Sequence, residues 1–134
     1  MSNKSDGTEF EKEVAQILSD HGYWAHCLQD KKNGQPFDII TAKNHKTYVM
    51  DCKRCTFSQF VFSRVEENQE LAMQAWRETG NSEGLFVIGF PNIGAYVILL
   101  SVIQELKKSG KKRICSQDMS HYGIPLETWM TISG

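Results

Sequence analysis

The chain has 134 residues, of which 40% are hydrophobic and 23% charged, and its formal net charge is −1. This length supports one compact core, so we expect a single domain spanning residues 1–134. A near-neutral charge excludes indiscriminate nucleic-acid binding over the whole surface, and any DNA affinity must come from local patches. No apolar run approaches the roughly 20 residues that span a bilayer. The first residues lack an apolar signal core, so we expect a cytoplasmic protein with no membrane partner.

A first helix is predicted over residues 8–21. Its apolar side chains recur at helical spacing: Phe10, Val14, Ile17 and Leu18. Gly22 follows as a C-terminal cap. Glu11 flanks the apolar stripe, so its carboxylate can face the edge of the core and reach a metal site from the side.

A short strand over residues 23–28 and a polar loop over residues 29–35 lead into a predicted hairpin. Its first strand follows Asp38, its turn covers residues 43–47, and its second strand runs from Tyr48 into Asp51. Strand pairing then brings the two carboxylates together. Side chains alternate along a strand, so Asp51 and Lys53 share one face while Cys52 points to the other.

Two acids and an amine on one face suit metal-assisted hydrolysis of a phosphodiester. Asp38 and Asp51, with a backbone carbonyl near Cys52, can hold Mg²⁺ against a phosphate oxygen and lower the pKa of a bound water. Lys53 can position that water and neutralise developing charge.

The next segment, residues 56–62, is aromatic. Its phenylalanines are Phe57, Phe60 and Phe62. Packing in the core or in a dimer interface is the favoured interpretation, and base stacking by exposed rings is the alternative. The three tryptophans, Trp24, Trp76 and Trp129, are also interpreted as packing residues.

A capping box at residues 63–66 predicts a second helix over residues 64–79. Gln69 falls in its apolar stripe, either as a partly exposed edge amide or as a residue directed at a site. Continuous apolar strands follow over residues 84–90 and 95–100. A second capping box at residues 101–104 predicts a short helix to Lys108.

Cations gather in two parts of the sequence, on loops flanking the hairpin and near the C-terminus. Such a run is usually a solvated face, and it can also contact phosphates. The candidate DNA-binding residues are Lys31, Lys32, Lys43, Lys46, Arg54, Lys111, Lys112 and Arg113.

The order helix, strand, strand, strand, helix, strand, strand resembles the PD-(D/E)xK nuclease superfamily. Within it, the chain is most similar to Holliday junction resolvases of the RecU type. The motifs that carry the resemblance are GTEFEKEV, PFDII, MDCK, Asn68-Gln69, LFVIGF, AYVILL and KKRICSQDMSHYGI.

The resemblance implies an α/β fold of the restriction-endonuclease type, with a central mixed sheet flanked by helices. It implies a homodimeric Mg²⁺-dependent endonuclease, able to use Mn²⁺, that nicks symmetric strands of a four-way DNA junction. Asp38 and Asp51 match the metal-binding acids, Lys53 the catalytic lysine, Glu11 the acid of the first helix and Gln69 the glutamine of the second.

The chain also departs from that family. Asp51 stands where related resolvases more often have Glu, and Phe37 fills a position that is often small or polar. Residues 29–35 are too few for the projecting stalk of RecU-type enzymes, whose basic N-terminal arm is absent as well.

Other functions stay open. The chain is alternatively another nuclease of the superfamily, acting on duplex or flap DNA, or a non-catalytic DNA-binding module on the same fold. Cys52 and Cys55 form a CxxC that could bind Zn²⁺ with Cys27, Cys115 or a histidine, or serve redox chemistry. No second CxxC exists and the two thiols face opposite sides of a strand, so buried, reduced thiols are favoured.

Overall fold

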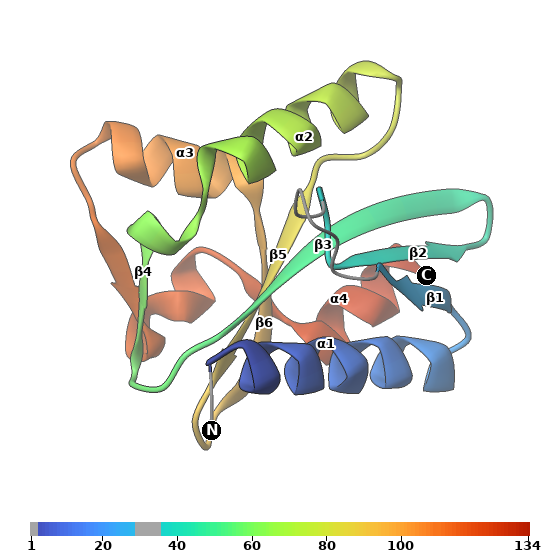
Figure 1. Ribbon diagram of the computed structural model, residues 1–134, viewed down its shortest axis with the longest axis horizontal. Helices are drawn as coiled ribbons and strands as arrows, with labels where there is room; N and C mark the ends of the chain where they lie inside the picture. Colours follow the sequence, from blue (N-terminus) through green and yellow to red (C-terminus); the bar gives the residue numbers. More distant parts are fainter. Residues whose placement is uncertain (1–2, 29–35) are drawn as a thin grey trace.

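The computed structural model of the protein describes residues 3–28 and 36–134, with side chains from Thr8 onward. A six-stranded sheet forms its centre, in the order β1-β2-β3-β5-β6-β8 (Figure 1). β3 and β5 are parallel and every other neighbouring pair is antiparallel. The predicted fold class, a central mixed sheet flanked by helices, is confirmed. The strands of this sheet are β1 (Trp24–Cys27), β2 (Ile39–Lys43), β3 (Lys46–Arg54), β5 (Leu85–Phe90), β6 (Gly94–Leu99) and β8 (Ile124–Pro125).

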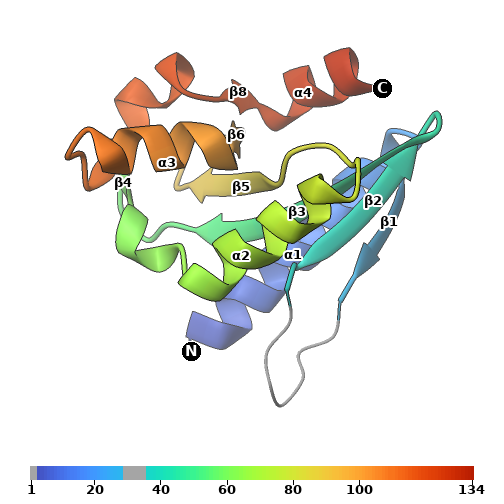
Figure 2. The same ribbon diagram turned by 90° about the horizontal axis from the view of Figure 1, so that it is seen from above.

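Helices cover both faces of the sheet and create two apolar clusters. The first cluster lies under α1 (Asn3–Asp20) and α4 (Leu126–Ser133), and the second under α2 (Glu67–Glu78) and α3 (Leu100–Lys108). Figure 2 shows the sheet between these two helical layers. The two clusters lie on opposite faces of the sheet, so alternate residues of β3 belong to different sides of the molecule.

The β2–β3 hairpin is closed by a two-residue turn. Asn44 and His45 both have positive φ, at 52° and 67°, and Lys43 is paired with Lys46. Two left-handed residues give a turn whose twist matches that of the flanking strands. The short turn sets the register in which Ile39 lies opposite Met50.

Gly89 allows α1 to pack closely against the sheet. A Cβ at this position would lie 2.7 Å from the Phe10 ring, so only glycine lets the ring approach the β5 backbone this closely. The contact fixes the height of α1 over β5, and with it the position of Glu11, the residue after Phe10.

The predicted starts of the second and third helices were wrong. Residues 62–64 form a 3₁₀ helix, η1, and the α2 capping box joins Glu66 to Gln69 rather than Ser63 to Glu66. The capping box predicted at residues 101–104 does not form either. The backbone N–H of Ser101 donates to Glu83 Oε1 from the preceding loop, so a residue distant in sequence caps α3.

Several elements were missed by sequence reasoning. β4 (Gln59–Val61) pairs with β7 (Arg113–Cys115) in a separate two-stranded sheet, and a 3₁₀ helix η2 (Ser116–His121) precedes β8. The C-terminal helix α4 was missed too, although its buried residues follow helical spacing: Leu126, Trp129 and Met130.

Exposure separates the aromatic residues that were all expected to pack. Phe60 and Phe62 are buried, as predicted, but Phe57 is 74% exposed. Trp129 is buried, whereas Trp24 is 61% exposed, so its predicted packing role was wrong. Trp24 lies on β1, which ends the sheet and has a neighbouring strand on one side only. Within the described ranges, no helix is both long and apolar enough to cross a membrane.

Candidate active site

Asp38 and Asp51 lie together at one end of the β2–β3 pair. Ile39 is opposite Met50, so the next position outward sets Asp38 across from Asp51. Asp38 is tied to β3 at two points, because its N–H donates to Met50 O (3.0 Å) and its Oδ2 accepts the N–H of Cys52 (2.7 Å). The expected pairing of the two carboxylates is present in the structure.

Asp51 is a buried acid with unsatisfied oxygens. It is 1% exposed, and among the described residues neither Oδ1 nor Oδ2 has a hydrogen-bond partner. Lys53 provides an ion pair, with Nζ 3.4 Å from Asp51 Oδ1, and its side chain is only 12% exposed. Burying an ionised group with this little compensation is costly, so the arrangement reduces stability unless something else binds there.

The pKa of Asp51 also indicates that its ionised form is poorly compensated. Burial raises the pKa of Asp51 well above its usual value, the negative charge of Asp38 raises it further, and Lys53 opposes both effects. Two adjacent carboxylates cannot both ionise cheaply without a compensating cation.

Cys52 occupies the opposite face of β3, as predicted. Its thiol is buried in the apolar cluster under α1. Burial raises the pKa of Cys52 well above its usual value, with further contributions from the charges of Asp38, Asp51 and Glu11. The thiol is therefore neutral, and the contact that Cys52 makes with the acid pair is through its backbone N–H.

Glu11 is near this group, on the α1 side. Its charge raises the pKa of both Cys27 and Cys52, and its backbone carbonyl accepts a weak hydrogen bond from Cys27 Sγ at 3.7 Å. In the part of the chain that the structure describes, no three His, Cys, Asp or Glu side chains converge to hold a metal ion. The parts of Glu11 and of the backbone carbonyl near Cys52 in binding a metal stay predictions.

Gln69 has a local structural partner. Its Oε1 accepts the N–H of Glu66 at 3.1 Å, which closes the capping box of α2. Of the two interpretations that the sequence left open, the half-buried amide at the edge of the helix is the one that accounts for this contact.

The acid pair fits a hard divalent cation. Mg²⁺ in enzymes is usually bound by one or two carboxylates and completes its coordination with water and substrate phosphate. Asp38 and Asp51 supply two carboxylates, and the Asp51 oxygens, which have no hydrogen-bond partner among the described residues, are ligands of the kind that Mg²⁺ prefers. The Cys52–Cys55 pair does not offer a zinc site, because the two thiols belong to clusters on opposite faces of the sheet.

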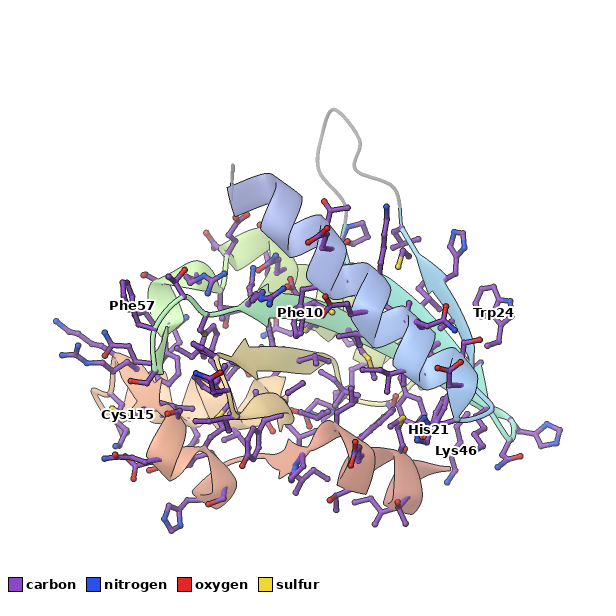
Figure 3. The ribbon with its side chains drawn as sticks, turned by 90° about the horizontal axis from the view of Figure 1, so that it is seen from below. Phe10, His21, Trp24, Lys46, Phe57 and Cys115 are labelled. Carbon is purple, nitrogen blue, oxygen red and sulfur yellow. The ribbon has the colours of Figure 1, made fainter. Side chains whose placement is uncertain are left out.

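The candidate DNA-binding cations separate into two groups. Lys43 is engaged internally, since its Nζ donates to His21 O at 2.9 Å and lies 4.9 Å from the centre of the Tyr23 ring. Lys46 is exposed at the same end of the molecule, opposite the end that carries Phe57 and Cys115 (Figure 3). Lys31 and Lys32 lie outside the described residues.

At the Cys115 end, four of the predicted cations are exposed: Arg54, Lys111, Lys112 and Arg113. Sequence reasoning missed a fifth, Arg64, whose Nη1 donates to the Arg54 carbonyl at 2.9 Å. A lone arginine between an aromatic segment and a helix carries no sequence signal, and only the fold brings it to this group.

No family model and no curated protein matches the sequence. Among solved structures, the fold is similar to that of Hjc, a Holliday junction resolvase from the archaeal hyperthermophile Archaeoglobus fulgidus. The TM-score is 0.70 at 16% sequence identity, over 96% of this chain and 100% of that chain. The match covers nearly all of this chain, so the chain has a restriction-endonuclease-like fold, with a central mixed sheet flanked by helices.

Proposed function

We propose that the protein is a metal-dependent DNA endonuclease, with four-way junctions as its preferred substrate. The observation that carries the proposal is Asp51, a buried acid whose two oxygens have no hydrogen-bond partner among the described residues, beside Asp38 and Lys53. The fold shared with Hjc, a Holliday junction resolvase, supports the choice of substrate.

The chemistry assigns a role to each residue of the group. Asp38 and Asp51 would hold Mg²⁺, or Mn²⁺ in its place, and the bound ion would supply a water of lowered pKa and a positive charge for the phosphate. Lys53, held in place by Asp51, neutralises charge that develops on the phosphate during cleavage. Glu11 adds a third negative charge beside them, and Gln69 holds the start of α2.

A non-catalytic DNA-binding module on this fold would not need the acid pair. Replacing a buried ion pair by apolar residues of similar volume is often neutral or stabilising, so a protein that only binds DNA gains nothing from Asp51 and Lys53. We also propose a homodimer, because symmetric nicking of a four-way junction requires two active sites.

The direct test is a cleavage panel. Four-way junction, flap, duplex and single-stranded DNA of matched sequence are incubated with the protein in Mg²⁺ and in EDTA. We expect two symmetric nicks in the junction with Mg²⁺ and none with EDTA. Cutting of duplex or flap DNA at equal rates would indicate another nuclease of the superfamily. Tight binding without cleavage in either Mg²⁺ or Mn²⁺ would favour the non-catalytic module.

The panel includes two variants. Asp51→Asn removes a proposed metal ligand, and Asp118→Asn is its control, because Asp118 is an exposed acid on η2. Cleavage that survives Asp51→Asn would contradict the proposal.

A further inference from the structure

Phe57 is the most exposed large apolar side chain in the described part of the protein. The nearby rings of Phe60 and Phe62 contribute to the core and are buried, so the exposure of Phe57 is not a sign of a loosely packed segment. Figure 3 shows Phe57 at the end of the molecule that also carries Cys115, projecting from the body of the structure.

The backbone on both sides of Phe57 is held in place. Before it, the N–H of Cys55 donates to Gly89 O at 2.8 Å, and after it, Ser58 O accepts the N–H of Ser116 at 2.7 Å. These bonds attach the segment to β5 and to the start of η2. The backbone that carries the Phe57 ring is therefore already ordered, which lowers the entropy cost of ordering this segment when a ligand binds.

Exposed cations lie on the elements next to the Phe57 segment. Arg64 joins η1 to the end of β3 through its bond to the Arg54 carbonyl, and Arg113 donates to Gln59 Oε1 at 3.1 Å on the β4–β7 sheet. Lys112 is attached to the same region, because its carbonyl accepts the N–H of Phe62. We call the exposed ring and its cations the aromatic corner; its members are Arg54, Phe57, Arg64, Lys112 and Arg113.

The aromatic corner adjoins the proposed active site along the chain. Phe57 is four positions after Lys53 along the chain, and four peptide units span at most about 14 Å. One strand of DNA advances about 3.4 Å per nucleotide. A strand whose phosphate lies at Lys53 can therefore place a base against Phe57 within about four nucleotides of the cut.

We infer that the aromatic corner binds an unpaired DNA base near the scissile phosphate, with Phe57 stacking on the base and the arginines and Lys112 contacting the flanking phosphates. The inference rests on the proposed function and deepens it. Stacking on an aromatic ring requires a base whose face is accessible, which branched DNA offers at its crossover and continuous duplex does not. Phe57 is thus a positioning residue that favours branched over continuous DNA.

Trp24 offers a matched control at the other end of the molecule. It is also a largely exposed aromatic residue, but its ring is stacked on His26 at 5.9 Å. The nearby hairpin residue Lys43 is engaged with His21 and Tyr23. Because the Trp24 ring is already stacked on His26, we do not expect it to stack on a DNA base.

The test measures binding in EDTA, where no cleavage occurs. Dissociation constants for four-way junction and duplex DNA are determined for the wild type, Phe57→Ala, Phe57→Trp and Trp24→Ala. We expect Phe57→Ala to weaken junction binding about tenfold, or about 1.4 kcal/mol, within the range for base–aromatic stacking. Duplex binding should be unchanged by this variant. Phe57→Trp should keep junction binding, and Trp24→Ala should change neither constant.

A second readout locates the base. Junctions carry the fluorescent base 2-aminopurine at single positions from one to eight nucleotides from the expected cut. We expect Phe57→Ala to change the fluorescence of the complex at positions within about four nucleotides of the cut, and not beyond. Thermal unfolding of each variant confirms that the exposed substitution leaves the fold intact.

Several results would overturn the inference. These are equal loss of junction and duplex binding in Phe57→Ala, no loss of either, or no DNA binding by the wild type. A change of oligomeric state in Phe57→Ala, measured by sedimentation, would instead assign Phe57 to a contact between copies of the chain. Binding is measured without Mg²⁺, so the two proposals can fail separately. A protein that stacks a base on Phe57 but never cuts would contradict the nuclease proposal and support base binding by the aromatic corner.

Discussion

The two faces of β3 satisfy their buried atoms in different ways. On the α1 side, Met50 and Cys52 lie within an apolar cluster. On the other side, Asp51 and Lys53 are nearly as buried, yet both oxygens of Asp51 are without hydrogen bonds among the described residues. One strand therefore contributes stability through one face and loses stability through the other.

This difference separates residues that keep the fold from residues that we propose perform chemistry. Apolar burial stabilises in proportion to the area removed from water, so the Cys52 face needs no ligand. The Asp51 face holds two like charges side by side, a state that a bound cation would relieve. Variants on the Asp51 face should therefore reduce cleavage, whereas variants on the Cys52 face should change stability and leave cleavage by the folded protein unchanged.

The largest effect is expected for Asp51→Asn. The amide removes a proposed metal ligand, and we expect the junction cleavage rate in saturating Mg²⁺ to fall at least about a hundredfold. Without metal, the variant should unfold at a higher temperature than the wild type, because the like-charge repulsion with Asp38 is gone. Rates and thermal unfolding with and without Mg²⁺ measure both effects. Stabilisation of the variant by Mg²⁺ equal to that of the wild type would count against Asp51 as a ligand.

Lys53→Met should lower cleavage by about a hundredfold as well, but with the opposite effect on stability. The substitution removes the positive charge that lies 3.4 Å from Asp51 Oδ1. Asp51 is then a buried acid with no ion-pair partner in Lys53, which should lower the free energy of unfolding by up to about 3 kcal/mol. Urea unfolding in EDTA gives the change in free energy. If Lys53→Met and Asp51→Asn shift stability in the same direction, the proposed antagonism of the two charges is wrong.

Cys52→Ser tests the other face. A hydroxyl placed in the apolar cluster without a partner should cost about 1–3 kcal/mol of unfolding free energy, while the cleavage rate of the folded protein should not change. Cys52→Ala is the control that removes the sulfur without adding a polar group. Loss of cleavage in a folded Cys52→Ala protein would show that the thiol itself takes part in the site.

The smallest effect is a slope of stability with pH. The pKa of Asp51 is raised in the folded protein, so the folded state holds its proton more tightly than the unfolded state does. The stabilising contribution is full below the ordinary aspartate pKa and is lost as pH rises through the raised value. In EDTA, the free energy of unfolding of the wild type should therefore fall over this range relative to that of Asp51→Asn. Identical pH profiles would show that burial of Asp51 has little electrostatic consequence.

Sequence reasoning succeeded where the relevant contacts are local. The placement of Asp38 opposite Asp51 follows from a short hairpin and from the alternation of side chains along a strand. The same alternation separated Cys52 from Lys53. The first helix and its stripe of Phe10, Val14 and Leu18 also follow from local spacing.

Sequence reasoning failed where local signals compete and where contacts join distant segments. The start of α2 was misplaced because two overlapping capping signals compete within a few residues, and the observed one ends at Gln69. The β4–β7 sheet joins segments more than fifty residues apart, and no local pattern marks its partners. Glu11 acts electrostatically on Cys27 and Cys52 from the α1 side, and its expected place beside the metal stays a prediction.

The pattern of apolar and polar residues along the chain specifies the hairpin that pairs two acids and the faces that become buried. Which polar groups find partners depends on how the sheet and helices pack. Lys43 contacts His21 and Tyr23, while Arg64 is part of the aromatic corner. Phe57 is exposed, while Phe60 is buried. The physical reason is that periodicity is a property of neighbours along the chain, whereas burial and pairing depend on segments that meet only when the sheet and helices have packed.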